Sequence, residues 1–222
     1  MGSSSSPPGH TRARLLAGAA RLAVPLASDQ LDALEAYAEE LLLWAPRFNL
    51  ISIRDLDSFV DRHLLDSLAA APLIAPLARH PRILDIGSGA GLPGVPVAIA
   101  TRAASACLVE PRQHRASFLR AVARRLPGFG LEIVPRRIED VDPASNGNLD
   151  AVLSRATLPL EQLLACSSTC LRIGGLLVSF RAIGQHEPPA AAASSFRKLQ
   201  DRLYSVAPGA PQMKLSVWER EG

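Results

Sequence analysis

Near the middle of the chain lies the stretch Ile83-Leu84-Asp85-Ile86-Gly87-Ser88-Gly89-Ala90-Gly91-Leu92-Pro93-Gly94. Its first four residues predict a buried strand, and residues 95–100 predict an apolar helix. Glycines between a strand and a helix N-terminus let the backbone approach a ligand closely and direct free N–H groups toward it. Pro93 and Pro96 suit the first helical turn, where a missing N–H breaks no hydrogen bond. The stretch therefore predicts a strand–turn–helix unit that binds a ligand.

Two classes of ligand site fit this turn. Residues 89–94 read G-x-G-x-x-G, the fingerprint of dinucleotide-binding proteins. The longer pattern that starts at Asp85, D-x-G-S-G-x-G, is typical of methyltransferases that use S-adenosylmethionine. In a dinucleotide site the strand runs straight into the first glycine of the triplet, whereas here the turn already begins at Gly87. We therefore favour the methyltransferase site over a dehydrogenase, with a plain tight turn as the simplest interpretation of such a pattern.

The composition is that of a globular protein with an excess of arginine. The 222 residues are enough for one sizeable core and an appended element, and 48% of them are hydrophobic. The formal net charge is +3, and all basic residues except Lys198 and Lys214 are arginines. Arginine suits phosphate contacts and stacking on bases. Because a general preference for arginine codons also explains the total, only the positions of the arginines can indicate nucleic acid.

The rest of the composition excludes several classes. The three cysteines lack the partners and spacing of a zinc site, so we expect reduced thiols in a cytoplasmic protein and no metal. The Ser/Pro/Gly-rich start predicts that residues 1–27 are disordered or weakly ordered. Arg21 and Pro25 interrupt the apolar run near the N-terminus, and no run is long enough to span a membrane. We expect a monomer without a membrane partner.

Residues 28–80 predict a helical extension. Ser28 can cap a helix over residues 31–44, which Pro46 is expected to end, and residues 57–71 predict a second helix. A polar set surrounds this otherwise apolar pair and predicts a rim over the site: Asn49, Arg54, Arg62, His63 and Asp66. Alternatively, the histidine and the aspartate, three residues apart on one helix, satisfy each other.

From residue 82 onward the pattern predicts alternating strands and helices, which is typical of a parallel sheet covered by helices. Strands are expected at residues 83–86, 106–110, 131–135, 149–154 and 176–180, with two closing strands at 204–207 and 213–218. Helices are expected at residues 112–126, 160–171 and 190–203.

Residues at or after the ends of three predicted strands are candidates for contact with the ligand. Glu110 ends the second strand, where a carboxylate accepts ribose hydroxyls of either NAD or S-adenosylmethionine. Ile138 and Glu139 follow the third strand, where an adenine ring would lie. Arg155 ends the fourth strand in the crevice where ligands bind such sheets, and it either clamps a carboxylate or phosphate or is a plain surface residue.

Four segments together resemble the RsmG (GidB) family of bacterial rRNA methyltransferases: Arg54-Asp55, Arg62-His63-Leu64-Leu65-Asp66-Ser67, residues 85–94 and Ser154-Arg155-Ala156. The resemblance runs from about residue 31 to the C-terminus. It implies an α/β, seven-stranded Rossmann-like S-adenosylmethionine-dependent methyltransferase fold over residues 81–222, with residues 28–80 as the helical extension. It also implies methyl transfer from S-adenosyl-L-methionine to N7 of a guanine in 16S rRNA of the small ribosomal subunit.

The resemblance also implies site residues. Five positions that match the family motifs, together with the remaining turn residues and the strand-end acid, give the expected cofactor set: Asp85, Gly87, Ser88, Gly89, Gly91, Leu92, Glu110, Ile138, Glu139 and Arg155. The expected RNA-binding set is Asn49, Arg54, Arg62, Arg112, Arg115 and Arg181. The chain departs from the family pattern where Ala45-Pro46 follows Trp44, at Ile51, at residues 112–115, and at Arg181 in place of a lysine.

Residues that the sequence lacks argue against some types of methylation reaction. Methylation of an exocyclic amine commonly uses an acid or Asn followed by Pro-Pro-aromatic, and this chain has Ser154-Arg155-Ala156-Thr157 there. Guanine N7 carries a free lone pair, so positioning and desolvation suffice and no catalytic residue is required. Arg54, His63 and Arg181 are possible contributors from the rim. The alternatives are an NAD(P)-dependent oxidoreductase and a non-catalytic nucleotide- or RNA-binding module.

Overall fold

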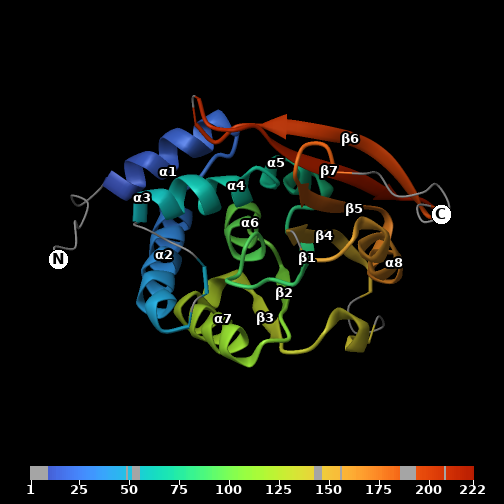
Figure 1. Cartoon of the computed structure of the whole chain (residues 1–222), viewed down its shortest axis with the longest axis horizontal. Coiled ribbons are helices and arrows are strands. Elements are labelled where there is room, and N and C mark those ends of the chain that lie inside the picture. Colours follow the sequence, from blue (N-terminus) through green and yellow to red (C-terminus); the bar gives the residue numbers. More distant parts are fainter. Residues whose placement is uncertain are drawn as a thin grey trace.

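A single sheet lies at the centre of the molecule (Figure 1). The computed structural model describes residues 10–48, 50–51, 56–142, 147–155, 157–185, 194–207 and 209–222. Within these ranges the sheet has seven strands in the order β3-β2-β1-β4-β5-β7-β6. The strands are β1 (Arg82–Ile86), β2 (Ser105–Val109), β3 (Leu131–Val134), β4 (Leu149–Arg155), β5 (Leu171–Arg181), β6 (Phe196–Tyr204) and β7 (Met213–Arg220). The predicted seven-stranded Rossmann-like fold is confirmed.

The order and direction of the strands indicate where a ligand would bind. Strands β1 to β5 are parallel, and β7 runs antiparallel to both β5 and β6. The chain adds β2 and β3 on one side of β1 and then returns to place β4 on the other. Ligands of such sheets bind at the carboxyl ends of the strands, where the strand order reverses. This switch point lies between β1 and β4.

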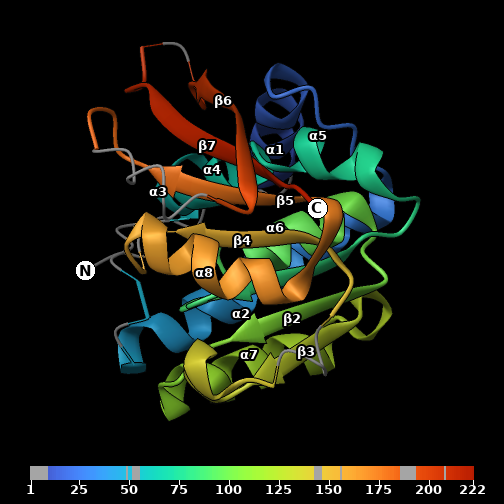
Figure 2. The ribbon, with the colours of Figure 1, turned by 90° about the vertical axis from the view of Figure 1, so that its right-hand side faces the viewer.

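Helices cover both faces of the sheet because the strand residues alternate between two cores. Ile83 and Leu108 pack against the core that includes α6 (Gly94–Thr101), α7 (Gln113–Arg125) and the N-terminal helices, whereas Leu84 and Val109 face α8 (Leu160–Cys170). Figure 2 shows α8 on the near side of the sheet, next to β4. The shorter helical elements are α3 (Leu56–Phe59), the π-helical turn η1 (Val60–Leu64), α4 (Leu65–Leu68), α5 (Ala71–Ile74), η2 (Ala75–Leu77), η3 (Pro127–Phe129) and η4 (Ile138–Asp140). Among the described residues, no helix is both long and apolar enough to cross a bilayer.

The long helix α2 (Ser28–Phe48) holds both ends of α6. At the N-terminal end, the buried Tyr37 hydroxyl donates a hydrogen bond of 2.5 Å to the Ala90 carbonyl in the glycine turn. At the C-terminal end, the Gln30 amide donates to the carbonyl oxygens of Ile99 (2.7 Å) and Ala100 (3.0 Å). The helical extension therefore packs directly on the element that shapes the turn.

The N-terminal region differs from the prediction. Residues up to 27 were expected to be disordered or weakly ordered, but α1 (His10–Arg21) is a helix whose Leu15 and Ala19 are buried. Arg12 links this helix to α2 through Asp32 (2.6 Å) and Glu35 (2.9 Å). An apolar stripe that finds a partner in the tertiary structure overrides weak local signals.

The predicted end of α2 is also wrong, because the helix continues through Pro46 to Phe48. Pro46 lies in the last turn, so its missing N–H removes only one hydrogen bond. The rings of Trp44 and Phe48, one turn apart, pack with centroids 5.1 Å from each other.

A third difference concerns the C-terminal hairpin. The helix predicted at residues 190–203 and the strand at 204–207 are wrong, because β6 occupies Phe196–Tyr204 and pairs with β7 along its length; residues 190–193 of that prediction lie outside the described residues. Both ends of β6 are anchored by aromatic side chains that are each 7% exposed. Cross-strand pairing thus outweighs the helix propensity of the segment.

Candidate functional site

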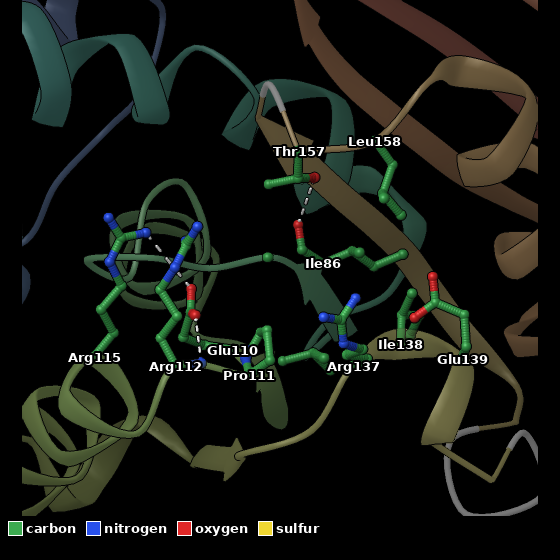
Figure 3. Close-up of a pocket in the computed structure, with 12 residues that line it drawn as sticks. Ile86, Glu110, Pro111, Arg112, Arg115, Arg137, Ile138, Glu139, Thr157 and Leu158 are labelled. Atoms are coloured by element: carbon green, nitrogen blue, oxygen red, sulfur yellow. Dashed lines mark hydrogen bonds and ion pairs between the residues drawn. The ribbon is translucent and has the colours of Figure 1, made fainter.

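A cavity of about 510 Å³ opens at the carboxyl ends of β1, β2 and β4 (Figure 3). Its volume lies in the range of small-molecule sites. The wall combines the ends of β1 and β2, the start of α7, the turn η4 and the segment after β4: Ile86, Gly87, Val109, Glu110, Pro111, Arg112, Arg115, Arg137, Ile138, Glu139, Thr157 and Leu158.

The glycine turn forms one side of this cavity. The backbone N–H groups of Gly87 and Ser88 both donate to the Val109 carbonyl, at 2.9 and 3.0 Å, and so tie the turn to the end of β2. Gly87 has φ of +72°, and a Cβ there would lie 2.3 Å from Cγ2 of Thr157. This position therefore requires glycine both for its backbone angle and for lack of space.

Glu110 lies at the cavity with its carboxylate fixed by backbone donors. The side chain is only 2% exposed, and its oxygens accept hydrogen bonds from the N–H groups of Gly89 (2.9 Å) and Arg112 (2.8 Å). A carboxylate has about four lone-pair sites, so each oxygen retains acceptor capacity for a hydroxyl in the cavity. Arg115 adds a positive charge, with Nη1 3.9 Å from the carboxylate. A preorganised acceptor beside a glycine turn suits a ribose diol.

Asp85 does not line the cavity. It is fully buried beneath the turn, where its carboxylate accepts the Gly94 N–H at 2.9 Å, and its other oxygen has no hydrogen-bond partner among the described residues. Burial raises the pKa of Asp85 to about 7, and the hydrogen bond from Gly94 opposes that shift. Asp85 therefore supports the start of α6.

This burial makes the stability of the fold depend on pH. Because the pKa of Asp85 is about 7 in the folded protein and 3.8 for an exposed aspartate, the folded state binds more protons between these values, and its stability falls as the pH rises through this window. Asp85→Asn keeps an acceptor for Gly94 but carries no charge. We expect the loss of unfolding free energy between about pH 5 and pH 8 to be smaller in the variant by roughly 2 to 3 kcal/mol. Urea denaturation at both pH values measures this difference, and parallel profiles would contradict the assignment.

Arg155 lies at the end of β4 but is not among the residues that line the cavity. Its Nη1 is 3.2 Å from Asp66, which is 5% exposed and also accepts a hydrogen bond from the Tyr204 hydroxyl. Burial raises the pKa of Asp66, while the bonds from Tyr204 and Arg155 oppose this. The pairing of His63 with Asp66 that the sequence left open is not formed. Instead, His63 packs on Phe59 with ring centroids 5.9 Å apart, and burial lowers its pKa to about 4, so the ring is neutral at pH 7.

The structure brings together part of each predicted set. Four residues of the cofactor set line the cavity: Gly87, Glu110, Ile138 and Glu139. Five others form the strand end and the turn without lining it: Asp85, Ser88, Gly89, Gly91 and Leu92.

The predicted RNA-binding residues are distributed more widely. Arg112 and Arg115 line the cavity, whereas Arg62 lines a second cavity of about 460 Å³ beside the loop between β6 and β7. Arg181 ends β5, opposite Lys214 of β7. Asn49 and Arg54 lie outside the described residues.

The predicted sets omit six residues of the wall: Ile86, Val109, Pro111, Arg137, Thr157 and Leu158. Each lies within three residues of a predicted site position, so the signal that could have found them is their place at or just beyond a strand end. No group of three or more His, Cys, Asp or Glu side chains in the described part of the chain is arranged to hold a metal ion.

Known structures with the same architecture define the class of fold. A putative methyltransferase, yhhF from Escherichia coli, superposes with a TM-score of 0.56 at 17% identity and covers 71% of this chain and 86% of its own. A mutant of MtNAS in complex with S-adenosylmethionine has a TM-score of 0.57 at 16% identity and covers 86% of this chain and 72% of its own. The fold is that of Rossmann-like methyltransferases.

Sequence comparison identifies the family. The family model described as GidB, rRNA small subunit methyltransferase G, matches residues 30–213. Proteins named ribosomal RNA small subunit methyltransferase G are 32% identical over 200 residues in Cellvibrio japonicus, covering 88% of this chain and 89% of the relative, and 33% identical over 204 residues in Chloroflexus aggregans, covering 90% and 84%. The chain belongs to the GidB family of small-subunit rRNA methyltransferases.

Proposed function

We propose that this protein transfers a methyl group from S-adenosyl-L-methionine to N7 of a guanine in 16S rRNA of the small ribosomal subunit. The observation that carries the proposal is the cavity between the glycine turn and Glu110, in a chain whose family match spans residues 30–213. The dinucleotide alternative finds less support, because β1 ends at Ile86 and the turn begins before the G-x-G-x-x-G triplet.

The residues of the cavity fit the cofactor. Gly87 lines the cavity and has no side chain, so a ligand can approach its backbone, and Glu110 presents acceptors suited to ribose hydroxyls. Ile138 and Glu139 provide the wall on which an adenine ring would lie. When bound, S-adenosylmethionine supplies an electrophilic methyl group on sulfur.

The protein has to position and desolvate the acceptor. Guanine N7 uses its own lone pair for the new bond, so no protein group removes a proton. We assign Arg112 and Arg115 to RNA phosphate because they line the cavity with positive charge. Residues 28–80 are proposed as the rim, with the neutral His63 and Arg181 as contributors to positioning. Arg155 lies at the carboxyl end of β4 and is paired with Asp66. We propose that it contacts the carboxylate of the cofactor.

The direct test is methyl transfer to purified small subunits that lack the modification, followed by mapping of the modified base. We expect incorporation at a single guanine N7. Cofactor binding without transfer to any RNA would favour a non-catalytic module, and tight NAD binding would favour an oxidoreductase. We propose a cytoplasmic location, because the proposed substrate is the small ribosomal subunit. We also expect a monomer, which light scattering tests.

The role of Arg112 predicts a change in the salt dependence of RNA binding. Arg112 is exposed at the start of α7, whereas Arg124 is exposed in the last turn of the same helix. Loss of one phosphate contact lowers the slope of log K against log salt by about one. We expect this change for Arg112→Ala and no change for Arg124→Ala, as measured by fluorescence anisotropy between low and moderate salt. Equal slopes for both variants would remove Arg112 from the RNA interface.

A further inference from the structure

An aromatic ladder joins α2 to α7. Its inner pair is Trp44 and Phe118, with ring centroids 5.9 Å apart at an interplanar angle of 61°, and its outer pair is Phe48 and His114, 6.5 Å apart at 15°. The two pairs differ in exposure: Phe118 is fully buried, whereas Phe48 is 39% exposed and His114 is exposed. The inner pair is therefore part of the core, and the outer pair presents nearly parallel rings to solvent.

The outer pair lies next to the cavity. His114 lies in the first turn of α7, between Arg112, which directly precedes the helix, and Arg115, and both of these arginines line the cavity wall (Figure 3). Phe48 is the last residue of α2 and reaches this end of α7. A nucleotide stacked on the outer pair would therefore be a close neighbour of a nucleotide at the mouth of the cavity.

The charges around the ladder differ between its two ends. At the far end, Arg125 is paired with Glu39 at 2.5 Å and approaches Glu40 at 3.9 Å. At the near end, the first turn of α7 contains no acidic residue, and no carboxylate of the described part of the chain lies within ion-pair distance of the Arg112 guanidinium. Exposed rings beside a guanidinium group that lacks an acidic partner are the combination that binds single-stranded nucleic acid.

We infer that Phe48 and His114 form a stacking site for an unpaired base of the RNA, adjacent to the nucleotide that is methylated, with Arg112 on the neighbouring phosphate. This inference rests on the proposed function, because it assigns a second subsite to the same RNA. Stacking is independent of base identity, since every base has a π face. The site thus supplies affinity and register, while the cavity selects the atom that reacts.

The stacking site is tested by direct binding measurements with two ligands. One is a twelve-nucleotide oligoadenylate, and the other is an abasic oligomer of the same length and charge. We expect Phe48→Leu and His114→Ala to weaken oligoadenylate binding by about 5- to 100-fold. Binding of the abasic oligomer, calorimetric affinity for S-adenosylmethionine and the melting temperature should remain at wild-type values. Phe48→Tyr and His114→Phe keep a ring and should keep affinity. Leu43→Ala is the matched control, because Leu43 is 59% exposed on the same helix.

Trp44 offers a second readout. Its ring lies 5.1 Å from that of Phe48, and Trp218 is buried at the other side of the sheet. In a Trp218→Phe background, oligoadenylate should change the emission of Trp44, and Phe48→Leu should abolish this change. Unaltered oligoadenylate affinity in both ring-deleting variants, or an equal loss for the abasic oligomer, would overturn the stacking site. Failure of the wild-type protein to methylate small subunits would instead overturn the proposed function, and the oligomer measurements separate the two outcomes.

Discussion

Gly87→Ala is expected to weaken binding of S-adenosylmethionine at least about thirtyfold, which corresponds to roughly 2 kcal/mol. The new Cβ would be 2.3 Å from Cγ2 of Thr157, and φ of +72° is a conformation that alanine adopts only at a cost of about 1 to 2 kcal/mol. Since Thr157 lines the cavity, any shift that relieves this contact changes the shape of the cavity itself. Calorimetric titration measures the affinity.

Two further variants separate the clash from the backbone strain. Gly184 has φ of +85°, but no heavy atom of the described residues lies within 4 Å of the point that a Cβ would occupy there, so Gly184→Ala reports strain alone and should leave affinity unchanged. Thr157→Ser removes Cγ2 but keeps the hydroxyl that donates to the Ile86 carbonyl at 3.1 Å. Adding Thr157→Ser to Gly87→Ala should restore part of the lost affinity. Unchanged affinity in a folded Gly87→Ala protein would show that the cofactor lies elsewhere.

Glu110→Ala is expected to have a still larger effect, a loss of cofactor affinity of at least about a hundredfold. The substitution removes the proposed ribose acceptor and leaves the N–H groups of Gly89 and Arg112 without their partner. Each buried donor that loses its acceptor costs about 1 to 3 kcal/mol, so the melting temperature should fall as well. Glu132→Ala, at an exposed acid in β3, is the control and should change neither quantity.

Ligand analogues distinguish ribose binding from support of the turn. Wild-type protein should bind the 2′-deoxy form of S-adenosylhomocysteine more weakly than the parent compound. In Glu110→Gln, which keeps one acceptor oxygen and the overall shape, the difference between the two ligands should shrink. An equal penalty for the missing hydroxyl in both proteins would mean that Glu110 only holds the turn.

The parts of the site that could be predicted from sequence are those fixed by neighbouring residues. The glycine turn and Glu110 follow directly from strands whose ends are visible in the pattern, and parallel strands bring those ends to one edge. The partner of Arg155 could not be found in this way, because Asp66 is 89 residues away from Arg155 and 138 residues away from its other partner, Tyr204. No local rule connects a helix to the last hairpin of the sheet.

The errors have the same origin. Residues 196–204 form a strand because β7 pairs with them, and α1 is ordered because α2, η1 and α4 supply acidic partners and an apolar surface. The outer pair of the aromatic ladder was equally inaccessible, since Phe48 and His114 belong to helices that the sequence does not place side by side. Tertiary contacts decide these features, and a single sequence reports them weakly.

The hydrogen bond between Tyr37 of α2 and Ala90 of the glycine turn has a consequence for how the chain folds during its synthesis. Ala90 follows Tyr37 by 53 residues, so at about 5 to 20 residues per second the ribosome needs roughly 3 to 10 s to synthesise the partner of this helix. During that interval Leu34, Tyr37 and Leu41, all fully buried in the finished protein, lack the part of their cover that α6 and α7 supply. A fragment that ends before α6 keeps part of this apolar stripe exposed permanently, which makes it prone to aggregation.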